Sequence, residues 1–309
     1  MTERIPILFN PSAGKGRARA RKAGLEEALR RHGVLFDLIV TRSEDELRAL
    51  VREQVGVCRT IAGAGGDSTF HIMANEIIRA AAETRLGIIG IGSSNDIARE
   101  FGLDGLDKAC AALKKGRARK IDLGCIRQEG STLRHFIGQA NFGLGVVVNQ
   151  YVESLAGRRP HLGKRQTLAG VMGVIQAFSR RKIPLPLRIE YENGSVSGEF
   201  VAAVFSNIRY WATGRIIAPA SRPDDGRLDA CLVRPCSFGR LLAIAAMSKR
   251  GRHVRMREVE MLSAPSFEVS SGTPFEVQTD GEILGGHQRP GRFTKLTICA
   301  ASQALNLVC

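Results

Sequence analysis

The stretch that decides the fold is TIAGAGGDSTFHIMANEI, residues 60–77. Its opening residues favour a β-strand, three glycines follow within four positions (Gly63, Gly65 and Gly66), and helix-forming sequence resumes after Ser68. Glycines let backbone N–H groups approach a ligand closely, and a helix that begins just after them adds its positive end, so the pattern is typical of a phosphate site. A plain turn with Asp67 or Ser68 as the helix N-cap explains the stretch equally well.

Strands and helices alternate on both sides of this turn. We expect strands at residues 5–10, 34–41, 58–63 and 85–92, and helices at 19–33, 43–55, 69–82, 94–102 and 106–116. This alternation predicts a Rossmann-like α/β nucleotide-binding domain with a parallel sheet over residues 1–122. Ligands of such sheets bind beyond the carboxyl ends of the strands, where Asn10, Thr41, the glycine turn and Gly92 fall.

The pattern changes after residue 122. Short strands, separated by turn residues such as those at 192–194 and 224–226, predict a β-rich sandwich domain over residues 123–299. Two apolar helical insertions, at 165–181 and 238–251, interrupt it. The C-terminal tail, about residues 300–309, is free to pack back on the first domain.

The composition narrows the choice of partners. The 309 residues carry a net charge of +15, which attracts nucleotides, nucleic acid or an anionic membrane surface. Aromatic residues make up only 6% of the chain, too few for the stacking platforms of single-strand binders, so nucleic acid is not expected. Seven cysteines without a C-x-x-C pair argue against a disulfide framework or a zinc site. No apolar run approaches the ~20 residues that span a bilayer, so we expect a cytoplasmic protein with peripheral membrane contact only.

Two further polar turns precede helices. FNPSAGKG, residues 9–16, has the glycine-rich composition of a Walker loop but not its spacing. GIGSSNDIARE, residues 90–100, brings small residues to a helix start, where N-capping by Ser94 or Asn95 is the ordinary explanation. Each turn is a weak signal alone. Their coincidence with the first turn, at one edge of one sheet, favours a nucleotide site.

Five short polar segments occur one after another along the chain. N-P-x-[SA]-G, G-G-D-[GS]-T and G-[TS]-x-N-D-[FI]-A-R are followed by DDGRLD at 224–229 and DGE at 280–282. The ordered set resembles the diacylglycerol kinase catalytic-domain superfamily, and most of all its soluble bacterial lipid kinases, whose relatives include ceramide and sphingoid kinases. The resemblance covers nearly the whole chain. It implies an ATP-dependent lipid kinase that binds ATP between its two domains and transfers the γ-phosphate to a hydroxyl of a membrane lipid, such as diacylglycerol or ceramide.

The resemblance also implies the site residues. The nucleotide contacts that carry over by position are Asn10, Thr41, Gly65, Gly66, Asp67, Ser68, Thr69 and Ser93, with Asn95 and Asp96 close by. For Mg²⁺ the implied ligands are the Asp225 carboxylate and the backbone carbonyls of Arg222 and Arg227. Asp280 and Glu282 are implied near the transferred phosphate, one as the general base and the other for orientation or metal coordination.

Ordinary turns remain the alternative explanation for the DDG and DGE segments. The chain also departs from the family pattern. Ser68 stands where the family usually has Gly, His71-Ile72 where it has Asn-Glu, and residues 90–93 read Gly-Ile-Gly-Ser in place of Pro-Leu-Gly-Thr. These changes motivate two other hypotheses: a soluble-substrate kinase of NAD-kinase type, and a catalytically weak lipid- or nucleotide-binding protein. His71 could replace the lost Asn contact, although a packing histidine is the simpler explanation.

Basic clusters flank the two apolar insertions, at 158–165, 180–182 and 249–257. Clusters of basic residues usually lie on solvent-exposed faces of a protein. With a lipid substrate, however, we expect them to face an anionic membrane surface, at about 1 kcal/mol for each well-placed basic residue. The expected location is then the inner face of the membrane. Exposed strand edges would also allow a homodimer.

Overall fold

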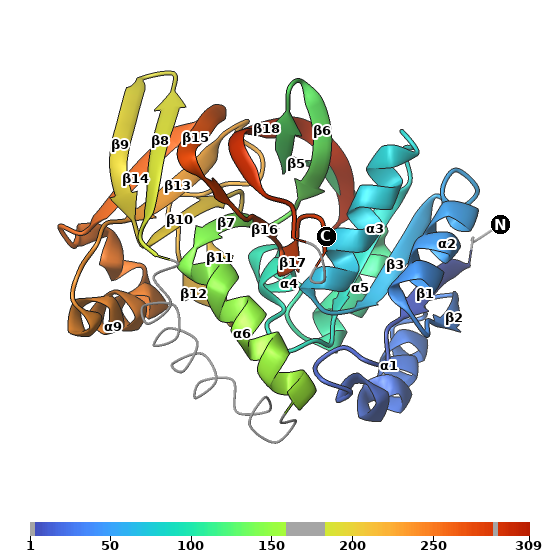
Figure 1. Cartoon of the computed structure of the whole chain (residues 1–309). Coiled ribbons are helices and arrows are strands. Elements are labelled where there is room, and N and C mark those ends of the chain that lie inside the picture. The colour runs from blue at the N-terminus through green and yellow to red at the C-terminus, as the bar shows by residue number, and fades with distance from the viewer. Residues whose placement is uncertain (1–3, 159–182, 287–289) are drawn as a thin grey trace.

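The computed structural model describes residues 4–158, 183–286 and 290–309 (Figure 1). The helical insertion expected at 165–181 lies outside these residues. The first elements are β1 (Ile5–Phe9), α1 (Ala18–Arg31), β2 (Phe36–Val40), α2 (Glu44–Gln54), β3 (Thr60–Gly65), α3 (Asp67–Arg79), β4 (Arg85–Gly90), α4 (Asp96–Glu100) and α5 (Leu106–Lys115). They are followed by β5 (Ala118–Gln128), β6 (Ser131–Phe136), β7 (Gln139–Gly143), α6 (Leu144–Arg158), β8 (Leu185–Tyr191), β9 (Gly194–Phe200), β10 (Ala202–Ser206), β11 (Tyr210–Trp211) and β12 (Arg215–Ile216). The last are β13 (Leu228–Val233), α9 (Phe238–Met247), two 3₁₀ turns (Ser248–Arg250 and Arg252–Arg255), β14 (Val259–Ala264), β15 (Ser266–Phe275), β16 (Gln278–Thr279), β17 (Glu282–Ile283) and β18 (Phe293–Val308).

The α/β domain forms the right-hand part of the molecule in Figure 1. Its strands lie in the order β2-β1-β3-β4 and pair in parallel, as the alternation predicts. The helices pack on this sheet around an apolar core that includes Ile61 and Phe70. α2 begins after its N-cap Ser43, whose Oγ accepts a hydrogen bond from the Glu46 N–H at 3.1 Å, while the Glu46 carboxylate accepts from the Arg42 N–H. The parallel pairing brings the carboxyl ends of all four strands to one edge.

The second part is a β-sandwich, as expected. One layer is an antiparallel sheet in the order β14-β13-β10-β7-β16-β17, and the other contains β5, β6, β8, β9, β15 and β18. Four buried phenylalanines interlock between the layers: the rings of Phe142 with Phe205 and Phe275, and of Phe205 with Phe267, meet edge to face at centroid distances of 5.1–5.5 Å. The chain therefore has the predicted fold class, an α/β domain followed by a β-rich sandwich.

β18 joins the two parts. Its beginning pairs with β15, most of its length pairs with β5, and near its end Leu307 pairs with Leu86 of β4. Leu305, Leu307 and Val308 lie in the apolar core of the α/β domain. The C-terminal tail thus packs back on the first domain, and one sheet continues from the α/β domain into the sandwich.

The helix α6 lies where the sequence predicts only short strands, outside the two helical insertions expected at 165–181 and 238–251. The strand β7 ends at Gly143, whose positive φ of 74° turns the chain, and α6 follows directly. Three consecutive valines hid this helix, because β-branched residues favour strands in a pattern read without tertiary contacts. Among the residues that the structure describes, no helix has both the length and the apolar character needed to cross a membrane.

Candidate active site

Two glycine turns meet at the carboxyl ends of β3 and β4. The N–H groups of Ile91 and Gly92 both donate to the Gly65 carbonyl, at 2.9 and 3.0 Å. A Cβ on Gly92 would come within 2.6 Å of the Gly66 Cα, so the two backbones touch and position 92 has no room for a side chain. The two turns, which lie 25 residues or more apart in the sequence, are therefore one structural unit with backbone groups at its surface.

Polar groups from neighbouring strands extend this edge. Asn10 follows β1 and donates from Nδ2 to Thr69 Oγ1 at 3.1 Å, while its Oδ1 accepts from the Ser12 N–H. Thr41 follows β2, is buried, and donates to the Phe9 carbonyl at 3.2 Å. A cavity of about 350 Å³ opens beside these residues. It is lined by Phe9, Pro11, Ser12, Arg19, Lys22, Val40, Thr41 and Arg42.

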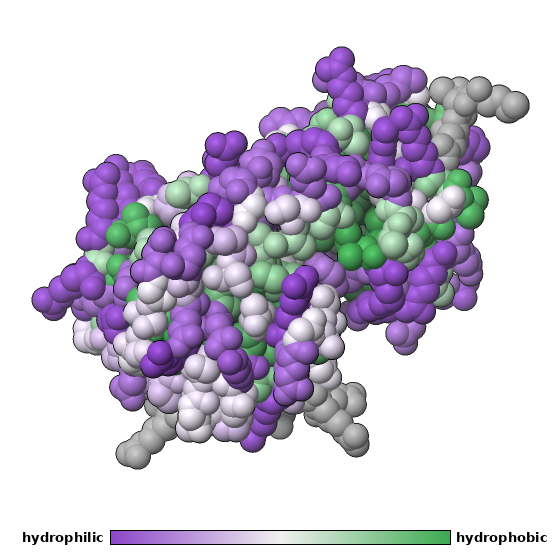
Figure 2. All heavy atoms as spheres, turned by 90° about the horizontal axis from the view of Figure 1, so that it is seen from above, coloured by the Kyte–Doolittle hydropathy of each residue, from purple (hydrophilic) through white to green (hydrophobic). Residues whose placement is uncertain are grey.

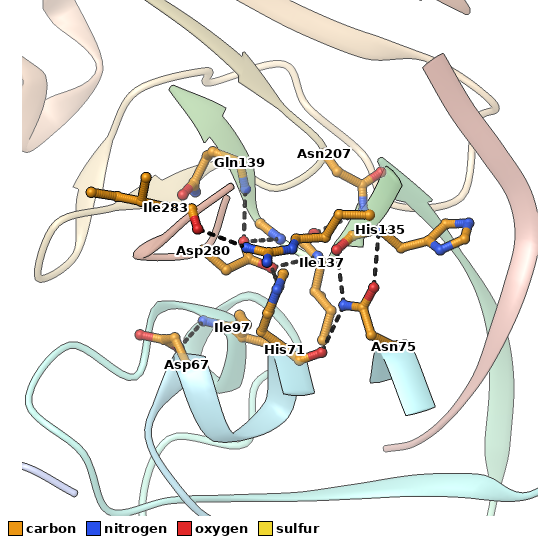
Figure 3. Close-up of polar contacts among 12 residues, drawn as sticks. Asp67, His71, Asn75, Ile97, His135, Ile137, Gln139, Asn207, Asp280 and Ile283 are labelled. Carbon is orange, nitrogen blue, oxygen red and sulfur yellow. Dashed lines mark hydrogen bonds and ion pairs between the residues drawn. The ribbon is translucent and has the colours of Figure 1, made fainter. Parts of the chain in front are cut away.

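Asp67 is the first residue of α3, and its carboxylate crosses to the start of α4. One oxygen accepts from the Ile97 N–H at 3.0 Å (Figure 3), and the other accepts from the Asp96 N–H at 3.2 Å. Asn95 stands before α4 in a left-handed conformation, φ 53°, which turns these two N–H groups toward Asp67. Asp67 thus holds the second glycine turn against the first.

The next carboxylate connects the two domains. Asp96 is buried and accepts hydrogen bonds from the N–H groups of Thr213 and Gly214 at 3.0 and 2.6 Å, in the turn between β11 and β12. It also pairs with Arg99 at 2.7 Å. Burial raises the pKa of Asp96 above its ordinary value, although these donors oppose the rise. The start of α4 is therefore tied directly to the second domain.

The pKa of Asp67 indicates what kind of group could bind beside the glycine turns. Burial raises it to about 7, and the negative charge of Asp96 adds to the rise. The two backbone hydrogen bonds oppose this effect without cancelling it. A carboxylate held in this way is stabilised by any positive charge that arrives beside it, which is the behaviour expected at a site for a cation or a metal-bound phosphate.

Asp280 lies at the centre of the space between the domains (Figure 3). Its Oδ1 accepts from the N–H groups of Gly138 and Gln139, at 2.8 and 2.9 Å. Its Oδ2 accepts from the Ile137 N–H at 2.7 Å and from His71 Nδ1 at 3.0 Å. The side chains of His71 and Asp280 are only 3% and 1% exposed. Four donors fill the lone pairs of this carboxylate, so Asp280 has no free acceptor for an incoming hydroxyl.

Glu282 lies two residues further, in the same turn, and is partly exposed. The turn is braced from two sides. Asn149 of α6 donates to the Gly281 carbonyl at 2.9 Å, and Arg134 of β6 donates to the Ile283 carbonyl at 3.3 Å. Burial lowers the pKa of Arg134, while the negative charges of Glu282 and Asp280 oppose that effect. The turn therefore presents Glu282 from a rigid support.

The DDG loop forms a separate cluster. Asp225 accepts from the Arg227 N–H at 3.0 Å, and the buried Asp122 accepts from the Gly226 N–H at 2.6 Å. Burial raises the pKa of Asp225, and the negative charges of Asp229 and Asp122 raise it further. Hard oxygen donors among several neighbouring carboxylates suit a divalent cation. Within residues 4–158, 183–286 and 290–309, no group of three or more His, Cys, Asp or Glu side chains could hold a metal by itself, so carbonyl oxygens would have to contribute.

Comparison with known proteins gives this geometry its context. The model of the diacylglycerol kinase catalytic domain matches residues 4–126, and that of the YegS C-terminal NAD kinase beta sandwich-like domain matches residues 138–306. The chain belongs to this kinase family. The two matches correspond to the α/β domain and to the sandwich.

Relatives of the kinase match along most of their length. A diacylglycerol kinase of Mycobacterium tuberculosis is 28% identical over 285 residues, which are 91% of this chain and 89% of that protein. A diacylglycerol kinase of Bacillus subtilis is 24% identical over 302 residues, covering 95% and 94%. The crystal structure of a diacylglycerol kinase from Bacillus anthracis superposes with a TM-score of 0.70 at 17% identity, covering 99% and 96% of the two chains, and so shares the fold.

The structure brings most of the predicted site residues of the kinase together. A first group surrounds the glycine turns: Asn10, Gly65, Gly66, Asp67, Thr69, Asn95 and Asp96. Thr41 lines the neighbouring cavity, and Ser93 accepts a hydrogen bond from Arg17 at 3.1 Å. Ser68 occupies the first turn of α3, where a side chain is accommodated in helical conformation. Arg222, Asp225 and Arg227 lie in the DDG loop, whose hydrogen bonds lead to Asp122 and not to the glycine turns.

Sequence reasoning missed several supporting residues of the kinase. Asn149, Arg134 and the N–H groups of residues 137–139 brace the turn at residues 280–282 without belonging to any motif. Asn75 is another case: it donates to the carbonyls of His71 and His135 and accepts from the His135 N–H. The spacing of four residues between His71 and Asn75 on one helix face was the only available signal.

The contact between the two glycine turns gives a first prediction. Gly92→Ala should force the turns apart, because the new Cβ would lie 2.6 Å from the Gly66 Cα. We expect the kinase to lose about 1–3 kcal/mol of stability and at least 10-fold in nucleotide affinity, measured by urea unfolding and isothermal titration. Gly24→Ala is the matched control, since α1 leaves its Cβ in open space and alanine should stabilise that helix by up to about 1 kcal/mol. Unchanged nucleotide affinity in Gly92→Ala would contradict the role given to this contact.

The raised pKa of Asp67 gives a second prediction. The folded kinase holds a proton on Asp67 up to about pH 7, whereas the unfolded chain releases it near the ordinary value of 3.8. The stability that comes from this proton is complete below about pH 4 and is lost as the pH rises to 7. The melting temperature of wild type relative to Asp67→Asn should therefore fall between pH 4 and 7 and stay level above pH 7. Parallel melting curves of the two proteins across that range would show that Asp67 titrates normally.

Proposed function

We propose that this kinase transfers the γ-phosphate of ATP to a hydroxyl of a membrane lipid, with diacylglycerol, ceramide or a related lipid as acceptor. The observation that carries the proposal is the His71–Asp280 hydrogen bond of 3.0 Å between the two domains. It holds the turn that precedes Glu282 against α3, the helix that begins at the first glycine turn, so that a phosphate acceptor and a phosphate donor would meet there. The relatives named as diacylglycerol kinases support a lipid as the acceptor.

The glycine turns would hold the nucleotide. Backbone N–H groups around Gly65, Gly66 and Ser93 and the hydroxyl of Thr69 are donors of the kind that phosphate oxygens accept from. The cavity beside Thr41 offers space for the base and sugar. Asp67 and Asp96 lie next to these turns, where a cation on the phosphates would neutralise them.

Mg²⁺ fits the donor atoms of the DDG loop. At the DDG loop the Asp225 carboxylate, with the carbonyls of Arg222 and Arg227, would supply oxygen ligands, and burial together with the nearby charges of Asp229 and Asp122 raises the pKa of Asp225. A bound cation would rigidify the loop that Asp122 ties to the end of β18 through Gln303. Near the phosphates, Mg²⁺ would supply charge neutralisation during transfer.

Glu282 is the better candidate for the general base. The Asp280 carboxylate accepts hydrogen bonds from four donors and would hold the turn in place. Glu282, by contrast, is partly exposed. In the proposed reaction the lipid oxygen bonds to the γ-phosphorus as the bond to the β–γ bridging oxygen breaks. Glu282 takes the hydroxyl proton, and the products are the phosphorylated lipid and ADP.

Transfer of labelled γ-phosphate to a panel of acceptors tests the proposal. Wild type, with ATP and Mg²⁺, would be offered diacylglycerol, ceramide, a sphingoid base and phosphatidylglycerol in mixed micelles. NAD belongs in the panel as well, because the C-terminal domain matches a model described as NAD kinase-like. Labelled lipid supports the proposal and names the acceptor. Labelled NAD, or no product at all from a kinase that binds ATP, would refute it in favour of a soluble substrate or a binding role.

A further inference from the structure

The helix α9 has apolar residues on both of its faces. Leu241 and Ile244 are buried against the sandwich, while Phe238 and Leu242 are 41% and 46% exposed. Ala245, Ala246 and Met247 extend the exposed side. An ordinary surface helix turns polar residues outward, so an apolar outer face on a well-capped helix indicates a second contact. The helix is well formed, since Ser237 caps it by accepting from the Arg240 N–H.

Basic side chains follow this apolar face directly. Lys249, Arg250, Arg252 and Arg255 are all exposed on the two 3₁₀ turns after α9. In the part of the chain that the structure describes, none of the four has a recorded ion pair with an acidic side chain. The neighbouring Arg240, by contrast, is paired with Glu258 at 2.7 Å. Exposed apolar residues beside uncompensated positive charge are the pattern of a helix that lies on an anionic lipid surface.

We infer that α9 and the basic turns after it are the surface by which the kinase docks on an anionic membrane. Phe238, Leu242 and Met247 would enter the boundary of the acyl chains, and Lys249, Arg250 and Arg252 would meet the lipid phosphates. The inference rests on the proposed function in one respect, namely that a membrane is where the acceptor is found.

The position of α9 in the fold is consistent with a membrane-docking surface. It lies at the lower left of Figure 1, on the same side of the sandwich as α6. Leu144 and Val147 of α6 pack on the same apolar cluster as Leu241 and Ile244 of α9. α6 in turn carries Asn149, which contacts the catalytic turn. The face seen from above is mostly hydrophilic at its rim and has hydrophobic residues nearer its middle (Figure 2).

Vesicle co-sedimentation tests the surface. The probe is unilamellar vesicles of phosphatidylcholine with 30% phosphatidylglycerol, and pure phosphatidylcholine for comparison. Neutralising three charges, in Lys249→Gln/Arg250→Gln/Arg252→Gln, should weaken binding to the anionic vesicles about 100-fold. Phe238→Gln/Leu242→Gln should weaken it about 10-fold or more. The matched control is Lys115→Gln/Arg117→Gln/Lys120→Gln, which neutralises three exposed basic residues of the α/β side and should leave binding within about 3-fold of wild type.

A second readout separates this inference from the proposed function. Each variant would also be assayed with a short-chain diacylglycerol below its micellar concentration, where no docking is needed. Retained turnover of the monomeric lipid with lost vesicle binding supports the docking surface. Vesicle binding unchanged in both α9 variants overturns it, even if the kinase phosphorylates lipids. An α9 variant that turns a dimer into a monomer without changing vesicle binding would assign the face to a second copy of the chain instead. Wild type that binds vesicles through α9 but phosphorylates no lipid would refute only the proposed function.

Discussion

Glu282→Gln is expected to slow phosphoryl transfer by a factor of about 10²–10⁴ and to leave nucleotide affinity nearly unchanged. The substitution keeps the size of the side chain and removes only its capacity to take a proton. Glu282 pairs with Thr279 across the turn, and the turn is held by Asp280, Asn149 and Arg134, so its backbone should not move. Single-turnover rates with saturating ATP, together with titration of ATP binding, measure the two quantities separately.

The control for this prediction is Glu199→Gln. Glu199 is exposed on β9, at the far edge of the sandwich sheet, and its removal should change neither quantity. Transfer by Glu282→Gln within 10-fold of wild type would exclude Glu282 as the base. A loss of ATP affinity as large as the loss of rate would instead assign Glu282 to nucleotide or metal binding.

The glycine turns show what local sequence can predict. Each turn follows a strand whose apolar residues and flanking helices mark it, so the carboxyl edge of the sheet and residues such as Asn10 and Asp67 could be named in advance. The backbone contact between Gly66 and Gly92 could not, because no periodicity reports which loops touch. The parallel pairing of β3 with β4 decides that contact.

The contacts between the domains were the least predictable part. His71 fits a packing histidine as well as a ligand when only the sequence is considered, and its partner Asp280 is 209 residues away. Its burial at 3% exposure agrees with packing, yet its ring also makes a polar bond across the domains. The sequence likewise left open whether Asp280 or Glu282 is the base. That choice depends on three backbone N–H groups of residues 137–139, which every sequence contains and no motif records.

Asp280→Asn is expected to destabilise the kinase by about 3–5 kcal/mol and to reduce transfer as strongly as Glu282→Gln. Both oxygens of Asp280 accept hydrogen bonds. In one orientation the new amide NH₂ would face the donors of Ile137 and His71, and in the other it would face those of Gly138 and Gln139, so donors would oppose donors either way. The turn would shift, and Glu282 with it. The free energy of unfolding, measured in urea, and the single-turnover rate should therefore both fall in this variant. In Glu282→Gln only the rate should fall.

His71→Ala completes the argument as a double-mutant cycle. Alone it should cost about 1–3 kcal/mol, because Asp280 keeps its three backbone donors and loses one bond. Combined with Asp280→Asn it should add much less than this, since the two residues are in contact. If the two costs add fully, the His71–Asp280 bond does not hold the domains together. If Asp280→Asn keeps the stability of wild type but loses transfer, Asp280 acts in the chemical step itself and the role of base returns to it.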